Sequence, residues 1–259
     1  PITAGVFAVG KASGGNTAQR LIINLSPLNQ VMDTSTVAPY LQEKYRLPSP
    51  DDFKFLQGQA GDAWRCYKTD VKSCFHQVSV RAHKIMHFFA MDTPEDVHKY
   101  CTTYPTGPDG NPVKERHYPC CCTLPMGWEN SVVSVQVFLA WLHGEVVPLG
   151  FDITTQPAGP LAHGTIIDDF FILACGKPSQ DLAGEWFSNV RRRWKDLKIP
   201  AKESKDVLNM TNTELIGILL RENGLFGAAG AKQYLHMVSV LLILSNWKNR
   251  VSVRARALG

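Results

Sequence analysis

Two neighbouring carboxylates stand between apolar residues in the segment Ile166-Ile167-Asp168-Asp169-Phe170-Phe171. An unpaired charge in an apolar environment costs far more free energy than a hydrogen bond returns. A plain tight turn that exposes Asp168 and Asp169 would explain the pair. A divalent metal ion would also explain it, because carboxylate oxygens at a hairpin tip are hard ligands whose mutual repulsion the ion offsets.

A third carboxylate, Asp70, ends the apolar-leaning segment 64–71. Three carboxylates from two neighbouring strands could hold two Mg²⁺ ions, which stabilise the attacking and leaving oxygens of an in-line phosphoryl displacement. One ion would activate a 3′-hydroxyl, and the other would hold the triphosphate of an incoming nucleotide. This pattern therefore suggests metal-assisted nucleotidyl transfer.

Hydrophobic patterning and turn residues predict the elements that must position these carboxylates. Strands are expected at residues 20–25, 64–71, 85–91 and 117–124, with a turn at Ser26-Pro27 and a polar loop at 92–116. Hairpins are expected to join 165–167 to 170–174 and 215–220 to 225–226, and helices to span 35–45, 131–147, 180–197 and 232–244. Strands and helices mix without a strict βαβ repeat, so the expected fold class is α+β.

The composition is that of a globular protein. Of the 259 residues, 44% are apolar and 19% are charged, which excludes wholesale disorder and a collagen-like fibre. The formal net charge is +4, and the basic excess follows Glu222, in Lys232, Lys248, Arg250, Arg254 and Arg256. This basic end could face a polyanion or be an ordinary solvated surface.

Cysteine content and hydropathy indicate the cellular compartment of the protein. The seven cysteines include no C-x-x-C pair, and the contiguous Cys120, Cys121 and Cys122 would alternate between faces of a strand, so reduced thiols are expected rather than a zinc site. No apolar window of about 18 residues or more occurs, and the N-terminus lacks a signal-peptide pattern. We expect an intracellular fragment, cytoplasmic or nuclear, without a membrane partner.

Five segments in a fixed order resemble the reverse transcriptases of retroelements. They are residues 20–29, 70–78, 124–128 with Ser131 and Gln136, 166–169, and 213–217, which resemble a fingers motif and palm motifs A, B, C and E. Motifs A and B resemble those of retrotransposons of the tyrosine-recombinase (DIRS-like) or long-terminal-repeat kind. Two departures are Ile166, where the family has an aromatic residue, and Asn24, where it has Asp; neither is an expected metal ligand.

The resemblance implies a right-hand polymerase fold. It places the fingers at 1–63 and 79–128, the palm at 64–78 and 129–222, and the start of the thumb at 223–259. It implies two Mg²⁺ ions, or Mn²⁺, on Asp70, Asp168, Asp169 and the main-chain carbonyl of Val71.

The resemblance also implies a general acid. A lysine of motif D would protonate the pyrophosphate leaving group. Both Lys202 and Lys205 follow Ile199-Pro200, and the sequence does not choose between them.

Several residues are expected to contact the phosphates of the nucleotide. The backbone N–H groups of Ser73 and Cys74 could cradle phosphate oxygens as a nest does, and Lys72 stands beside them. Arg20 could bind a phosphate with its guanidinium fork, and Lys11 could add a second charge. Solvated surface positions are the alternative for Lys72 and Lys11.

Further residues are expected at the sugar and base. In the family, the residue at Phe75 lies under the sugar of the incoming nucleotide, where a ring would exclude a ribose 2′-hydroxyl; a core aromatic is the alternative. Met126 and Gly127 belong to the bend of motif B, where backbone can approach the nucleotide closely. Ser131 is expected to cap the next helix, and Gln136 to reach back from it towards the nucleotide.

The sequence thus predicts a reverse transcriptase that binds an RNA or DNA template–primer duplex and dNTPs. An RNA-dependent RNA polymerase is one alternative, against which Phe75 and the lack of Gly before Asp168 speak. A catalytically silent relic that only binds nucleic acid is the other, against which the three intact carboxylates speak. The oligomeric state stays open.

Overall fold

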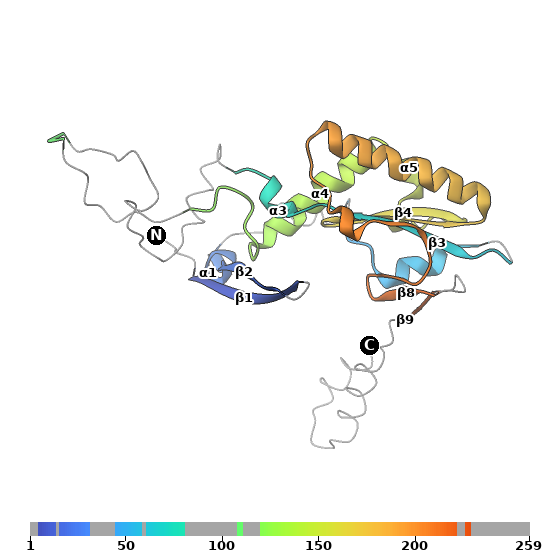
Figure 1. Cartoon of the computed structure of the whole chain (residues 1–259), viewed down its shortest axis with the longest axis horizontal. Helices are drawn as coiled ribbons and strands as arrows, with labels where there is room; N and C mark the ends of the chain where they lie inside the picture. The colour runs from blue at the N-terminus through green and yellow to red at the C-terminus, as the bar shows by residue number, and fades with distance from the viewer. Residues whose placement is uncertain are drawn as a thin grey trace, which may run out of the picture. The chain divides into compact units, whose positions relative to one another are not determined.

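The structure is a computed structural model of the chain, and it describes residues 5–13, 16–31, 45–58, 61–80, 108–110, 120–221 and 226–228 (Figure 1). The chain divides into two compact units, Pro1–Arg46 with Val71–Trp141, and Leu47–Asp70 with Leu142–Gly259. The boundaries predicted above for fingers, palm and thumb stay predictions.

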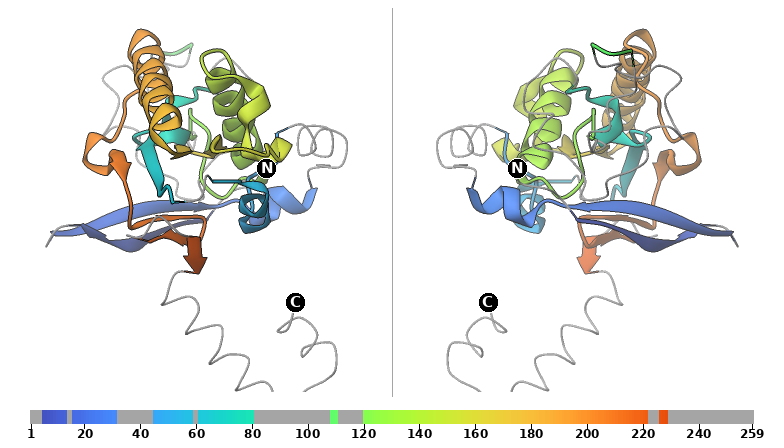
Figure 2. Two further views of the ribbon diagram at one scale, coloured as in Figure 1. Left: turned by 90° about the vertical axis from the view of Figure 1, so that its right-hand side faces the viewer. Right: turned by 90° about the vertical axis from the view of Figure 1, so that its left-hand side faces the viewer.

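The first unit begins with an antiparallel hairpin, visible in Figure 2 as the long blue ribbon pair. Its strands are β1 (Gly5–Ser13) and β2 (Asn16–Asn24), which confirms a strand near 20–25. Helix α1 (Ser26–Val31) follows directly, so the turn expected at Ser26-Pro27 was wrong. The proline stands in the first helical turn, where its missing N–H costs no hydrogen bond.

Two further helices begin in this unit. They are the short α3 (Cys74–Gln77) and the longer α4 (Glu129–Gly144), which confirms a helix near 131–147. Ser131 lies inside α4 rather than capping it, and its hydroxyl donates to the carbonyl of Pro125 at 2.8 Å.

The second unit is built on a four-stranded antiparallel sheet with strand order β4-β5-β3-β6. Its strands are β3 (Trp64–Asp70), β4 (Leu161–Ile166), β5 (Asp169–Cys175) and β6 (Val207–Met210). Helix α5 (Lys177–Asp196) lies over this sheet (Figure 1), where a helix was expected at 180–197. A second sheet contains β7 (Thr213–Leu215), β8 (Ile218–Leu220) and β9 (Phe226–Ala228).

Short 3-10 helices complete the second unit. They are η1 (Pro50–Phe55), η4 (Leu149–Phe151), η5 (Ile153–Thr155) and η6 (Glu203–Lys205). The last of these connects the end of α5 to β6, and it carries one of the two candidate acid lysines.

The two faces of the four-stranded sheet bury different sets of residues, because side chains alternate along a strand. On one face the ring of Tyr67 packs against Phe187 of α5, with centroids 6.0 Å apart. On the other, Phe171 stacks on Phe53 of η1 at 6.2 Å. That second core also contains buried Trp64, Cys66, Ile153, Ala162, Leu173, Cys175, Leu215 and Leu220.

The hairpin predicted around the paired carboxylates is confirmed, with longer strands. Its turn lies at Ile167 and Asp168, and Asp169 is already the first residue of β5. Ile167 adopts a left-handed conformation with φ 54°.

The single strand expected over 215–220 was wrong. Ile216 and Gly217, with φ of 52° and 80°, form a turn that separates β7 from β8. The expected partner at 225–226 corresponds to β9, which pairs with β8. Strand β6 was not predicted.

Other expectations fall largely outside the described residues: the helices at 35–45 and 232–244, the strand at 85–91, the loop at 92–116 apart from 108–110, and the basic C-terminal end. Of the strand expected over 117–124, the described part contains an isolated bridge between Thr123 and Ser79 rather than a continuous strand. Among the described helices, none has the length and apolarity needed to cross a bilayer. No disulfide joins the six cysteines that the structure describes, and burial raises the pKa of Cys66 to about 12.

Candidate active site

Three carboxylates meet at one end of the β3–β5 ladder. The register places Asp70, the last residue of β3, directly opposite Asp169, the first residue of β5. Asp168 lies in the turn immediately before Asp169. Asp70 is only 3% exposed. Two strands distant in sequence therefore deliver the three acids to one place, as the sequence predicted.

The carboxylates affect one another electrostatically. Burial raises the pKa of Asp168, and the neighbouring charges of Asp70 and, to a smaller extent, Asp169 raise it further. Like charges in a partly buried site disfavour the ionised form. The cluster therefore favours a cationic partner.

Two lysines lie against these acids. Lys68 Nζ is 2.9 Å from Asp169 Oδ2, and Lys205 Nζ donates to Asp70 Oδ2. The hydrogen bond to Asp70 raises the pKa of Lys205. Lys68 was not predicted as a site residue, although its position two residues before Asp70 on a strand places both on the same face.

The three carboxylates carry the kind of oxygen ligand that a divalent cation takes. Among the described residues, no group of three or more His, Cys, Asp or Glu side chains is arranged to hold a metal ion as it stands. Within the same part of the chain, the buried Asp169 Oδ1 has no hydrogen-bond partner. A buried carboxylate oxygen without a donor is costly, and hard oxygens of this kind are the ligands that Mg²⁺ and Mn²⁺ prefer. Val71, buried next to Asp70 in sequence, stays a predicted main-chain ligand.

The structure distinguishes the two candidate acid lysines. The backbone N–H of Lys202 donates to the carbonyl of Asp70 at 2.8 Å, so Lys202 contributes main chain to the site. Lys205, three residues on in η6, contributes its ammonium group to the Asp70 carboxylate. Sequence spacing alone could not show this difference.

The first unit contains the residues predicted to bind the nucleotide after Asp70. Ser73 is exposed and left-handed, with φ 53°, and precedes the short helix α3. Lys72 is exposed, Cys74 is buried and Phe75 is half-buried. Their predicted roles stay predictions.

The predicted phosphate ligands Arg20 and Lys11 belong to the β1–β2 hairpin. Arg20 stands opposite Val9, and Lys11 stands opposite Ala18. Two register positions therefore separate them along the ladder.

Motif B approaches the β2–α1 segment closely. A Cβ on Gly127, whose φ is 103°, would lie 2.7 Å from the carbonyl oxygen of Ile23. Asn29 donates to the Gly127 carbonyl at 3.0 Å and accepts from the Glu129 backbone N–H at 3.3 Å. Glycine at 127 is thus required by protein packing, and its predicted approach to a nucleotide stays a prediction.

The other predicted nucleotide ligands near this bend differ in burial. Met126 is half-buried, whereas Gln136, in α4, is buried. Their predicted contacts with the nucleotide also stay predictions.

A family model described as reverse transcriptase (RNA-dependent DNA polymerase) matches residues 10–220. The chain belongs to the reverse transcriptase family. The match includes all three carboxylates and both candidate acid lysines. No curated protein matches the sequence.

Two solved structures of telomerase are similar to this chain. Telomerase from Candida albicans, in complex with a fragment of telomeric RNA, is 12% identical with a TM-score of 0.50, over 92% of this chain and 49% of that chain. Apo telomerase from Candida tropicalis, truncated from its C-terminal domain, is 12% identical with a TM-score of 0.47, over 88% of this chain and 55% of that one. The chain thus spans about half the length of these telomerase chains.

The family match and the Candida albicans structure confirm the expected fingers and palm polymerase fold of class α+β. The assignment to a retrotransposon of the DIRS-like or long-terminal-repeat kind stays a prediction.

Proposed function

We propose that this member of the reverse transcriptase family joins dNTPs to the 3′-end of a primer on an RNA or DNA template. The observation that carries the proposal is the placement of Asp70 opposite Asp169, with Asp168 in the adjoining turn. Three acids at the end of an apolar sheet repel one another unless they bind a cation. A cation held there could act on a reacting phosphate, which explains their placement.

Asp70, Asp168 and Asp169 would hold the divalent ions. When bound, Mg²⁺ would activate the primer hydroxyl and stabilise the charge on the leaving oxygen. The 3′-hydroxyl would lose its proton to solvent as its oxygen forms a bond to the α-phosphorus of the dNTP, and the bond from that phosphorus to the bridging oxygen of pyrophosphate would break.

Lys205 would act as the general acid. Its ammonium group, kept protonated beside Asp70, would give a proton from Nζ to the departing pyrophosphate. Lys202 would serve by its backbone, through the hydrogen bond to the Asp70 carbonyl.

Primer extension tests the proposal. We compare dNTPs with rNTPs on an RNA template, using wild type, Asp168→Asn and the matched control Asp181→Asn on the exposed face of α5. Asp168→Asn should lower the rate at least about a thousand-fold, or ~4 kcal/mol of barrier, with an unchanged melting profile. Asp181→Asn should extend at the wild-type rate.

Three outcomes of this assay contradict the proposal. Near wild-type turnover of Asp168→Asn would contradict the assignment of Asp168 as a metal ligand. A wild type that binds template–primer without extending it would be a silent relic. A preference for rNTPs would make it an RNA polymerase.

Phe75 supplies a second test, of sugar choice. Replacing Phe75 with Ala should raise rNTP use relative to dNTP use by about 10- to 1000-fold, because a steric exclusion disappears with the ring. The measurement is kcat/KM for both nucleotides on one template–primer. An unchanged ratio would leave Phe75 a packing residue of the first unit.

We further propose that the protein acts inside the cell, in the cytoplasm or nucleus, where template and dNTPs occur. Detection of the tagged protein in fractionated cells tests this placement. Recovery only from the secreted fraction would contradict it.

A further inference from the structure

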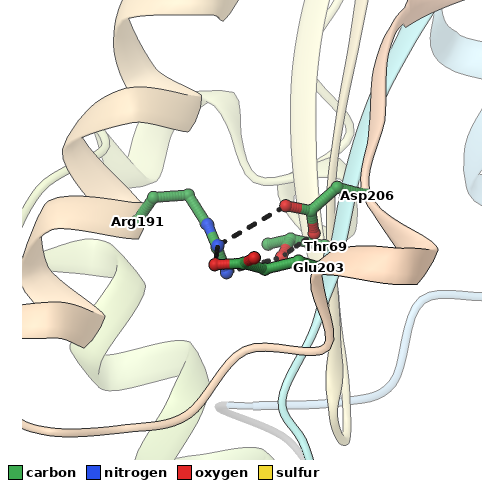
Figure 3. A network of polar contacts seen from close by, with 4 residues as sticks. All are labelled: Thr69, Arg191, Glu203 and Asp206. Carbon is green, nitrogen blue, oxygen red and sulfur yellow. Dashed lines mark hydrogen bonds and ion pairs between the residues drawn. The ribbon is translucent and has the colours of Figure 1, made fainter.

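A network of four residues fastens the segment that carries Lys205 to strand β3 and helix α5 (Figure 3). Arg191 of α5 contacts Asp206 Oδ2 through Nη2 at 3.5 Å and Glu203 Oε1 at 3.4 Å. Its Nη1 donates to the hydroxyl of Thr69 at 3.4 Å, and that hydroxyl donates to Asp206 Oδ1 at 2.7 Å.

The inner part of the network is shielded from water. Thr69 is fully buried, and the side chains of Arg191 and Asp206 are 23% and 18% exposed. The Glu203 side chain is 84% exposed. Exposed ion pairs contribute little, so Thr69, Arg191 and Asp206 carry most of the interaction.

Both ends of the segment 202–206 are tied to the same point of β3. At its start, the Lys202 N–H donates to the Asp70 carbonyl. At its end, Asp206 accepts from Thr69, the residue before Asp70. Lys205 lies between these two attachments, and its ammonium group contacts the Asp70 carboxylate.

We propose that Arg191 is a positioning residue that, through Asp206 and Thr69, holds Lys205 at the carboxylate cluster. The guanidinium fork suits this task because its two terminal nitrogens contact different partners at fixed separation, which the single ammonium of lysine cannot do. The catalytic meaning of this positioning rests on the proposed function, whereas the positioning itself can be tested without activity.

The first test is acylation of the full chain with sulfo-N-hydroxysuccinimide acetate, followed by peptide mass spectrometry. The rate at Lys205 is divided by the rate at exposed Lys195. Arg191→Ala and the near-isosteric Thr69→Val should each raise this ratio about three- to ten-fold, because Lys205 is released. Thr69→Ser keeps the hydroxyl and should keep the ratio.

Arg192→Ala is the matched control. Arg192 is the exposed neighbour on the same helix and bonds to Asn189 on its own helix. Arg192→Ala should leave the ratio of the acylation rates at Lys205 and Lys195 unchanged. If Arg191→Ala does not fold, Thr69→Val with Thr69→Ser decides the question. An unchanged ratio in folded Thr69→Val would overturn the proposal.

The second test uses extension kinetics. Arg191→Ala and Thr69→Val should lower kcat about 10- to 100-fold with KM for dNTP within about two-fold, because a general acid acts in the transition state. Thr69→Ser should restore kcat. A wild type without extension would refute the proposed function and leave the acylation result standing. Unchanged kcat in an active enzyme whose Lys205 ratio had risen would overturn the catalytic meaning of this positioning.

Discussion

The two faces of the four-stranded sheet carry different kinds of residues, because alternate residues of the same strands point to opposite faces. On the face that packs against α5, Tyr67, Thr69, Phe170 and Ile172 are all buried and neutral. On the other face an apolar row ends in Asp70 and Asp169. The difference shows that one pair of strands can provide stability on one side and a charged site at the end of the other.

One buried polar group from each region shows a related contrast. Beside Phe170, the buried His143 donates from Nδ1 to Thr165 Oγ1 at 2.7 Å and accepts at Nε2 from the Trp194 indole at 3.2 Å. This assignment of donors follows from the indole, which can only donate. His143 is therefore fully satisfied by protein, whereas Asp169 Oδ1 has no partner among the described residues. A satisfied network stabilises the fold, and an unsatisfied oxygen suits a ligand.

The largest expected effect is a loss of folding stability when a core residue of the α5 face is replaced. Phe170→Ala should destabilise the protein by about 3–5 kcal/mol, because a fully buried ring that packs against His143 and His163 is replaced by a cavity. Asp168→Asn, two residues earlier, should leave the free energy of unfolding nearly unchanged. Urea denaturation of both variants measures this contrast. A stability loss in Asp168→Asn as large as in Phe170→Ala would erase the distinction between the regions.

The buried histidine predicts a pH dependence of stability. Burial lowers the pKa of His143 to about 3 from 6.5, so the unfolded chain binds the proton more readily than the native protein. Its contribution is complete above about pH 6.5 and is lost as the pH falls towards 3, at up to about 1.4 kcal/mol per pH unit. Between pH 7 and 5 the loss should reach roughly 2 kcal/mol.

His143→Gln is the control for this titration, because it keeps a donor and an acceptor without a group that titrates near neutrality. Urea midpoints between pH 7 and 5 should fall less steeply in this variant. His163, whose pKa burial also lowers, contributes to the slope that remains. Parallel curves for wild type and variant would assign the dependence to other groups.

A smaller effect is expected on the face that ends in the acids. A Cβ added at Gly164 would lie 2.5 Å from Cζ of Phe171 and 3.1 Å from Cγ2 of Ile153. Gly164→Ala should therefore cost about 1–3 kcal/mol through overpacking. The double variant Gly164→Ala with Phe171→Leu should recover part of this loss if the clash is the cause. Thermal denaturation of the two variants measures these changes in stability. A single variant as stable as wild type would show that the neighbouring side chains move to accommodate the added methyl group.

The smallest effect concerns the attachment of α5 to the sheet. The Tyr67 hydroxyl donates to the carbonyl of Gln180 at 3.1 Å. Tyr67→Phe should destabilise the protein by about 0.5–1.5 kcal/mol, since one intramolecular hydrogen bond is lost. Phe187→Leu tests the ring contact separately. A Tyr67→Phe variant as stable as wild type would mean that ring packing alone holds this part of the helix.

The amino-acid sequence by itself determined the features that local pattern encodes. An apolar-leaning run predicted β3, helical periodicity predicted α5, and paired acids between apolar runs predicted the hairpin that carries Asp168 and Asp169. The ordered motifs identified the reverse transcriptase family, which the match over 10–220 confirmed. Each of these signals is a pattern along the chain, within one strand, helix or motif or in the order of the motifs, so no distant contact is needed to recognise it.

Only the tertiary structure decided which distant residues meet. It brought Lys205 rather than the Lys202 side chain to Asp70, placed Lys68 on Asp169, and joined Arg191 to Thr69 across the sheet and helix. It also placed a turn at Ile216, where an apolar run predicted a continuous strand. Long polar side chains have no preferred partner in the sequence, because their contacts depend on burial and charge that exist only once the strands and helix have packed.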